Sequence, residues 1–238
     1  MTKIKLVGTA IAAMFLMSSA TNAAELYTPE PIPSAVSGWY FSGFGGANWS
    51  NSTDFDIDVT GVATGNVVNA YDTGFLAGGA VGYDLGSVSG PIGIRLEGEF
   101  GYRSNDVKSH NIGGGGPNAV GPAFGDTNVI AGMANMLFDL NTGSPFILYG
   151  GGGVGVANVD FDGHGVQGVA VVMDDDDTVF AWQLIAGVGL EIMPNMVLDV
   201  QYRYFRADDV SLTAAISGVT SSTNYESNAV VAGLRRSF

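Results

Sequence analysis

The sequence predicts an all-β fold, an eight-stranded antiparallel up-and-down β-barrel that crosses a membrane. Three observations predict it. Apolar and polar residues alternate with a period of two in eight segments, and beyond residue 37 no segment has a convincing helical period. The connections between these segments are alternately short and long. The chain is also both apolar and acidic, with 46% hydrophobic residues and a formal net charge of −14 over 238 residues.

The composition excludes several classes of protein. A chain with this share of hydrophobic residues and 11% aromatic residues is too apolar to be intrinsically disordered. Only 9 Lys and Arg stand against 23 Asp and Glu, which argues against binding to nucleic acid. The absence of cysteine removes disulfides, thiol catalysis and cysteine-ligated zinc, and two histidines leave little material for a metal site.

Residues 1–23 are predicted to be a secretory signal peptide. Lys3 and Lys5 precede an apolar run at residues 6–17, and small or polar residues follow up to Ala23, after which we expect cleavage. The alternative is a transmembrane anchor, but about 12 apolar residues fall short of the roughly 20 that a spanning helix needs.

Residues 24–37 are predicted to be an extended linker. Pro29, Pro31 and Pro33 lie within five residues of one another, and proline-rich segments are extended and semi-rigid. The barrel is therefore assigned to residues 38–238.

Each of the eight segments is predicted as a strand because its alternate positions divide into an apolar and a polar face. The division is clearest where Leu96 and Phe100 share one face while Arg95 and Glu99 share the other. The segments are about 9 to 14 residues long, longer than an ordinary strand and long enough to cross a bilayer at a tilt. In chain order they are 39–49, 75–85, 92–103, 128–140, 146–159, 180–192, 197–205 and 225–238.

The connections predict which ends of the strands lie together. Short turns follow the second, fourth and sixth strands, and long polar, glycine-rich loops follow the others. An even number of strands with short turns at one end and long loops at the other is typical of outer-membrane barrels. The turns are residues 86–91, 141–145 and 193–196, and the loops are residues 50–73, 104–127, 160–177 and 206–224.

A soluble β-sandwich or ligand-binding barrel is the alternative to the membrane barrel, because soluble strands also alternate. Aromatic residues recur near the segment ends, as the interfacial girdles of membrane barrels require. The charged faces mix arginine with acidic residues, which suits a narrow interior where charges pair. The inverted arrangement would leave Arg95 and Arg203 facing lipid, at a cost of about 2 to 4 kcal/mol each at mid-bilayer.

Several short motifs carry a resemblance to a known family. They are the signal peptide, the run Glu97-Gly98-Glu99-Phe100-Gly101-Tyr102-Arg103, the glycines 150–153 after Tyr149, the segments 186–190 and 198–204, and the terminal Phe238. On these motifs the chain, over about residues 38–238, resembles the small outer-membrane β-barrels of Gram-negative bacteria. These are the OmpA-like or opacity-type barrels of the "porin family", and the resemblance is closest to alphaproteobacterial members.

The resemblance implies that the barrel-assembly machinery reads the terminal aromatic residue, here Phe238. The family often has another aromatic residue two positions before the end, where this chain has Arg236. This departure bears on the efficiency of assembly and leaves the expected fold unchanged.

One glycine pattern imitates a cofactor site. Gly150, Gly152 and Gly155 match the dinucleotide-binding fingerprint, but the residues that follow open no helix to receive a pyrophosphate. We interpret the pattern as a glycine-rich strand that lets bulky lumen side chains of its neighbours approach closely. No cofactor is predicted.

Two clusters of aspartate lie in the long loops. Asp174, Asp175, Asp176 and Asp177 are oxygen ligands of the kind that Ca²⁺ or Mg²⁺ takes, but they lack the ligand spacing of an EF-hand, so a solvated acidic loop is favoured. Asp54, Asp56 and Asp58 alternate with apolar residues, which predicts a strand that continues above the membrane with an acidic face.

The two histidines give no catalytic site from sequence alone. His110 and His164 both fall in predicted long loops, on the external side. Ser109 and Asp106 lie near His110, but residues that are neighbours in sequence need not meet in space. The chain is therefore predicted not to be an enzyme, with no catalytic, cofactor-binding or metal-binding residues.

The polar faces of the strands predict a network of paired charges in the lumen. An eight-stranded barrel is just wide enough inside for side chains to fill it. Its predicted members are Arg95, Glu97, Glu99, Arg103, Asp139, Glu191, Asp199, Arg203 and Arg235, with Asp84 as a sixth strand acid. Most of the excess negative charge then lies in the loops, which predicts an acidic outer surface.

These observations predict a monomeric outer-membrane surface protein with a filled polar lumen and four long acidic, glycine-rich external loops. Its role is structural or adhesive, and the alternative is a porin-like channel for small solutes or ions. The expected partners are outer-membrane lipid and lipopolysaccharide, together with the assembly machinery. The resemblance implies contact with envelope components or host surfaces through the loops, and no nucleic acid is expected.

Overall fold

The computed structural model of the protein describes residues 37–50, 53–59, 63–112, 123–166, 171–213 and 220–238. The predicted signal peptide and all but the last residue of the predicted linker lie outside these ranges. The described residues form strands joined by turns, and none of their segments is a helix long and apolar enough to cross a membrane.

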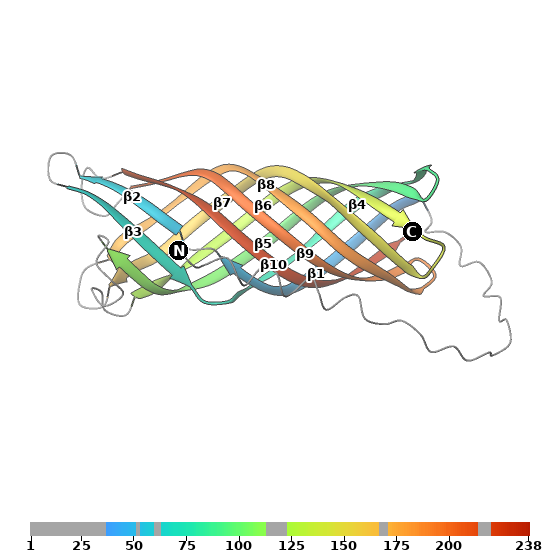
Figure 1. Cartoon of the computed structure of the whole chain (residues 1–238), viewed down its shortest axis with the longest axis horizontal. Coiled ribbons are helices and arrows are strands. Elements are labelled where there is room, and N and C mark those ends of the chain that lie inside the picture. Colours follow the sequence, from blue (N-terminus) through green and yellow to red (C-terminus); the bar gives the residue numbers. More distant parts are fainter. Residues whose placement is uncertain (1–36, 51–52, 60–62, 113–122, 167–170, 214–219) are drawn as a thin grey trace, which may run out of the picture. The chain divides into compact units, whose positions relative to one another are not determined.

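Eight long strands close into a barrel, as the sequence predicts (Figure 1). Each pairs antiparallel with the next in the chain, and β1 pairs with β10 from Tyr40 opposite Ser237 to Ser50 opposite Ser227, which completes the ring. The eight strands are β1 (Gly38–Ser50), β4 (Gly74–Ser89), β5 (Ile92–Ile112), β6 (Ala123–Asn141), β7 (Phe146–Val166), β8 (Val171–Met193), β9 (Met196–Thr213) and β10 (Thr220–Ser237).

Two shorter strands lie in the first predicted loop and continue the barrel wall. β2 (Thr53–Val59) pairs with β10, and β3 (Ala63–Tyr71) pairs with β5, so these two strands occupy the places of β1 and β4 further along the barrel. The ring therefore stays eight strands wide. The strand predicted from Asp54, Asp56 and Asp58 is confirmed as part of β2.

The short connections lie together at one end of the barrel, which we call the turn end. Gly90 and Pro91 join β4 to β5, and Pro194 and Asn195 join β8 to β9. Asn195 has a φ of 65°, as a type II turn with proline before it requires. The predicted turn at 86–91 is too long, because β4 continues to Ser89 through two irregularities in its pairing with β5.

The long connections lie at the opposite end, the loop end, and here the sequence-based boundaries are wrong. Most residues of the predicted loops belong to strands that run on past the predicted limits, for example β5 to Ile112 and β7 to Val166. His110, His164 and the run Asp174 to Asp177 therefore lie in strands. The glycine-rich stretch 113–116 lies outside the described residues.

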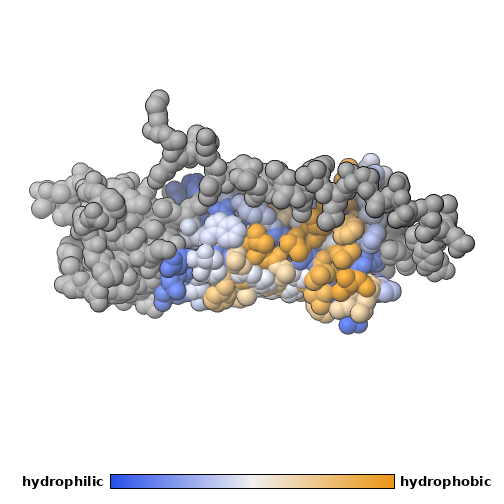
Figure 2. All heavy atoms as spheres, turned by 60° about the horizontal axis from the view of Figure 1, so that its bottom comes forward, coloured by the Kyte–Doolittle hydropathy of each residue, from blue (hydrophilic) through white to orange (hydrophobic). Residues whose placement is uncertain are grey.

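The segments predicted as strands correspond to the part of each strand that carries exposed apolar side chains on the outer wall. We call this part of the wall the apolar belt. In β6, exposed hydrophobic residues run from Ile130 to Leu140, and Asn128 comes next. Eleven tilted strand residues rise by about 28 Å, which matches the apolar core of a bilayer. Figure 2 shows such hydrophobic side chains gathered on one part of the wall, with hydrophilic residues beside them.

Aromatic pairs border this apolar belt at both edges. At the turn end Trp39 packs edge-on against Tyr83 with ring centroids 5.3 Å apart. At the other edge the rings of Trp182 and Tyr204 lie 5.4 Å apart. These are the girdles that the aromatic residues near the segment ends predict.

Candidate functional site

The interior of the barrel, the lumen, is filled with side chains. Inward positions of all eight long strands contribute, and the largest fully buried side chains include one arginine and several aromatic residues. They are Arg103, Tyr40, Tyr225, Phe205, Leu76, Leu137, Gln183, Val129 and Val159. The lumen, rather than a surface cleft, is therefore where the predicted charged residues come together.

A first polar layer lies toward the turn end. Arg95 donates from Nε to Asp139 Oδ2 at 2.6 Å and from Nη2 to Asp139 Oδ1 at 2.8 Å, so the pair is bidentate. Its Nη1 donates to Glu97 Oε1 at 3.3 Å, and the Tyr40 hydroxyl donates to the same oxygen at 2.7 Å. The Arg95 guanidinium also lies 4.8 Å from the centre of the Tyr149 ring. Planar bidentate contacts of this kind fix both partners.

A second polar layer is centred on Glu99. Its Oε1 accepts from Arg203 Nη1 at 2.6 Å and from Gln183 Nε2 at 3.3 Å, and its Oε2 accepts from Asn135 Nδ2 at 2.8 Å. Gln183 also donates to Asn135 Oδ1 at 2.8 Å. The amides of Asn135 and Gln183 are not among the lumen residues predicted from the sequence. Both occupy inward positions of alternating strands, and this alternation is the signal that could have located them.

The predicted charge pairing is confirmed for most of the arginines but wrong for Arg103. Arg235 Nε lies 3.8 Å from Asp199 Oδ2, a longer separation than in the other lumen pairs. Arg103, in contrast, forms no ion pair with a described residue and stacks on the Phe205 ring at 3.8 Å. The alternation along β5 correctly predicts that the Arg103 side chain points inward. It does not predict the contact with Phe205, which belongs to another strand, β9.

An apolar cluster fills the lumen between the second polar layer and the loop end. Small and β-branched side chains from β6 to β9 pack there against Phe205 and Tyr225. The members are Val129, Ala131, Met133, Ala157, Val159, Ala181, Phe205, Ala207, Val210 and Tyr225. The two polar layers and the apolar cluster thus follow one another along the inner face of the barrel.

Glycines provide the space for the large lumen side chains. The Tyr149 ring lies across Gly187, where a Cβ atom would come within 2.5 Å of it, and Tyr40 lies across Gly82 in the same way. In β7, a Cβ on Gly153 would meet the Asn135 side chain. The interpretation of the glycine run as a strand that allows close approach is confirmed, and no helix follows it.

The loop end carries carboxylates on adjacent strands. Asp106 lies opposite Asp126 across β5 and β6, and Asp160 lies opposite Asp176 across β7 and β8. Asp176 accepts a hydrogen bond from Asn158 Nδ2 at 2.7 Å. Among the described residues no three His, Asp or Glu side chains form a group that could hold a metal ion.

Asp176 and Asp177 are the two predicted loop aspartates of this run whose side chains the structure describes, and they do not share a site. Successive residues of a strand face opposite sides of the sheet, so Asp176 and Asp177 point apart, and Asp177 instead accepts from the Ser211 amide at 2.8 Å. The side chains of Asp174, Asp175, His110 and His164 lie outside the described part of the chain.

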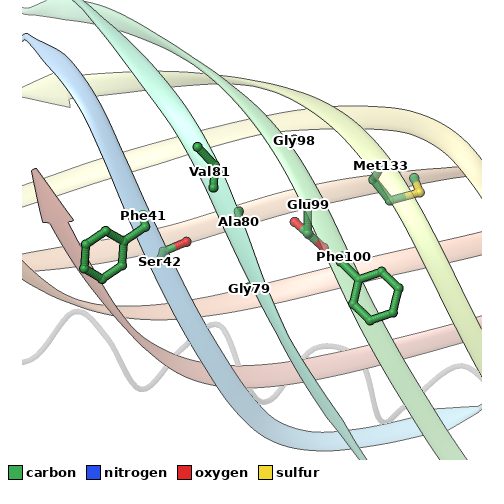
Figure 3. Close-up of a pocket in the computed structure, with 9 residues that line it drawn as sticks. All are labelled: Phe41, Ser42, Gly79, Ala80, Val81, Gly98, Glu99, Phe100 and Met133. Atoms are coloured by element: carbon green, nitrogen blue, oxygen red, sulfur yellow. The ribbon is translucent and has the colours of Figure 1, made fainter.

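Glycines also leave two shallow grooves in the outer wall. One, of about 580 Å³, lies over β1, β4 and β5. Figure 3 shows Phe41 and Phe100 on either side of it and no side chain at Gly79 or Gly98 between them. The second, of about 490 Å³, crosses β6 to β8 beside Gly152. Both grooves lie within the apolar belt, so they face the hydrocarbon core of the membrane.

Comparisons with known proteins agree with this architecture. Residues 10–238 match the family model of the outer membrane protein beta-barrel domain. An uncharacterised protein of Brucella abortus is 28% identical over 221 residues, which cover 80% of this chain and 77% of that protein. The outer membrane protein PagN of Salmonella typhimurium is 26% identical over 200 residues, which cover 76% of this chain and 79% of PagN.

A solved structure shares the fold. The outer membrane protein OprG from Pseudomonas aeruginosa matches with a TM-score of 0.50 at 16% sequence identity, and the match covers 85% of this chain and 97% of OprG. The family match includes every strand of the barrel, and the apolar belt has the height of a bilayer core. The chain belongs to the family of the outer membrane protein beta-barrel domain and is an integral protein of the bacterial outer membrane.

Proposed function

We propose that this protein is a closed scaffold that displays its loop end outside the cell, in a structural or adhesive rather than an enzymatic role. The proposal is supported by the two polar layers and the apolar cluster, which succeed one another along the lumen. A hydrated ion that crossed this lumen would have to displace the bidentate contact of Arg95 and Asp139 and then pass the apolar side chains packed around Phe205. Both steps are costly in a low-dielectric interior.

The exposed part of such a scaffold is the loop end. In outer-membrane barrels the short turns face the periplasm and the longer connections face outward. The strands continue well beyond the apolar belt here, and they carry carboxylates such as Asp106, Asp126 and Asp176. We propose that this acidic part of the wall meets lipopolysaccharide, envelope components or host surfaces, with divalent cations needed wherever the partner is anionic.

The turn end fits a different partner. Phe238 is 73% exposed, and its ring lies 6.2 Å from that of Phe41 at the edge of the apolar belt. An exposed terminal aromatic residue on an edge of the closing strand pair is accessible to the assembly machinery before the barrel closes. We propose that Phe238 is the recognition residue for assembly and that the assembled barrel is a monomer.

Conductance across a planar bilayer tests the closed scaffold. The purified protein should produce no reproducible openings at modest voltage. Reproducible openings would overturn the proposal and favour the second candidate, a narrow channel for small solutes or ions. In that case alanine at Glu97 or Arg203, which belong to the two polar layers, should change the conductance.

A further inference from the structure

The guanidinium of Arg103 is buried, and most of its donors have no acceptor among the described residues. The residue is 1% exposed, and its only hydrogen bond to a described residue is a long one of 3.4 Å from Nη2 to Gln183 Oε1. Nε and Nη1 are both buried and have no acceptor among the described residues. A buried cation in this position is costly unless another group neutralises it.

The charges nearby do not balance Arg103. The second polar layer holds two arginines, Arg103 and Arg203, and one carboxylate, Glu99. The carboxylate already accepts three hydrogen bonds, the shortest of them from Arg203 at 2.6 Å. One positive charge is thus left over beside a layer in which all the other charged groups are paired.

A second buried donor without a partner in the described part of the chain lies on a neighbouring part of the lumen wall. Gly101 lies beside the guanidinium, and a Cβ atom built there would be 3.7 Å from Arg103 Nη1, so this neighbour carries no side chain that could serve as an acceptor. Ser227 faces the lumen opposite Phe205, the residue on which Arg103 stacks. The hydroxyl of Ser227 is buried and has no partner among the described residues.

We propose that Arg103 holds a small monovalent inorganic anion of the halide class inside the lumen, bound by Nε and Nη1 with the Ser227 hydroxyl as a further donor. Charge-assisted hydrogen bonds to an anion would neutralise the guanidinium and satisfy donors that the protein leaves open. A single positive charge is left over, so a monovalent anion neutralises it. Glu99, the carboxylate of the same layer, is already neutralised by Arg203 at 2.6 Å.

The anion site does not depend on whether the lumen conducts, because it requires only that Arg103 be buried without a carboxylate. A closed barrel would take up the ion during folding, and a conducting one would exchange it. Failure of the conductance experiment and failure of the anion site are therefore distinguishable.

Bromide provides a direct test. Crystals of the protein grown with sodium bromide should show an anomalous scattering peak within hydrogen-bonding distance of Arg103 Nε or Nη1. Crystals of Arg103→Gln under the same conditions should lack that peak. A wild-type map with no peak at this position overturns the proposal.

A stability measurement provides a second, independent test. An ion that binds only the folded state raises the midpoint of unfolding. The refolded protein should unfold at a higher temperature in sodium chloride than in sodium gluconate at equal ionic strength, and Arg103→Gln should abolish this difference. Arg236→Gln is the matched control, because Arg236 is exposed on the outer wall of β10 and should keep the full difference.

Equal midpoints of the wild type in the two salts overturn the proposal. So does a chloride-dependent shift that persists undiminished in Arg103→Gln. If Arg103→Gln does not fold, the bromide map and the wild-type salt comparison still decide the question.

Discussion

Glu99 is the carboxylate on which the second polar layer depends. It accepts hydrogen bonds from residues of three other strands, Arg203 on β9, Gln183 on β8 and Asn135 on β6. A group that joins four strands across the lumen restrains their relative positions as well as neutralising a charge. Its removal leaves Arg203 buried without a counter-charge.

Glu99→Gln should therefore lower the free energy of unfolding by about 3 to 5 kcal/mol, the usual cost of breaking a buried ion pair. Glu226→Gln is the matched control, because it breaks the ion pair between Glu226 and Arg206, two side chains that are each about one-third exposed. This variant should lower the free energy of unfolding by about 0 to 1 kcal/mol. Urea unfolding in lipid vesicles measures both. Similar losses in the two variants would contradict the assignment of Glu99 to a dry layer.

At the scale of the element, the close approach of β6 and β7 depends on the glycines of β7. Gly151 pairs with Leu137 on β6, and a Cβ on Gly151 would lie 2.0 Å from the Met136 carbonyl oxygen. Backbone atoms cannot move aside as the end of a side chain can. The hydrogen-bonded pairing of β6 with β7 therefore requires glycine at this position.

Gly151→Ala should lower the free energy of unfolding by about 1 to 3 kcal/mol, the usual cost of overpacking. Gly132→Ala, on the neighbouring strand, adds the same methyl group where nothing lies within 4 Å, and should be nearly neutral. Equilibrium unfolding in the same vesicles compares them. An unchanged stability of Gly151→Ala would show that β6 and β7 can separate without loss.

At the scale of the whole molecule, the barrel extends further on one side of the apolar belt than on the other. The turn end follows the belt within a few residues, whereas β8 begins at Val171, nine residues before Phe180, where the belt begins on that strand. The proposed orientation places this longer part outside the cell. A chain without cysteine offers a clean background in which to test it.

Ser211→Cys, on an exposed position of β9 toward the loop end, should react on intact cells with a maleimide that does not cross membranes. Ser144→Cys, exposed in the turn between β6 and β7, should react only after the outer membrane is permeabilised. Labelling is read from the mass of the purified protein. The reverse pattern would show that the barrel is inserted the other way round.

The sequence by itself determined the part of the fold that lies in the membrane. Along β5 the alternation of Leu96 and Phe100 with Arg95 and Glu99 is sharp, because lipid lies on one side of the strand and the lumen on the other. Beyond the apolar belt both faces of a strand carry polar residues, so the period-two pattern weakens, and the extensions that contain His110 and Asp176 were predicted as loops.

The pairing of the charged side chains in the lumen depends on the closed barrel and could not be predicted from the sequence. Arg95 and Arg103 share one face of β5, and the sequence offers each the same set of acidic partners. Closure of the ring brings Asp139 to Arg95 and an aromatic ring, Phe205, to Arg103. The contacts across a barrel depend on strand register and on the space that glycines leave, and neither quantity is encoded in the local pattern of a single strand.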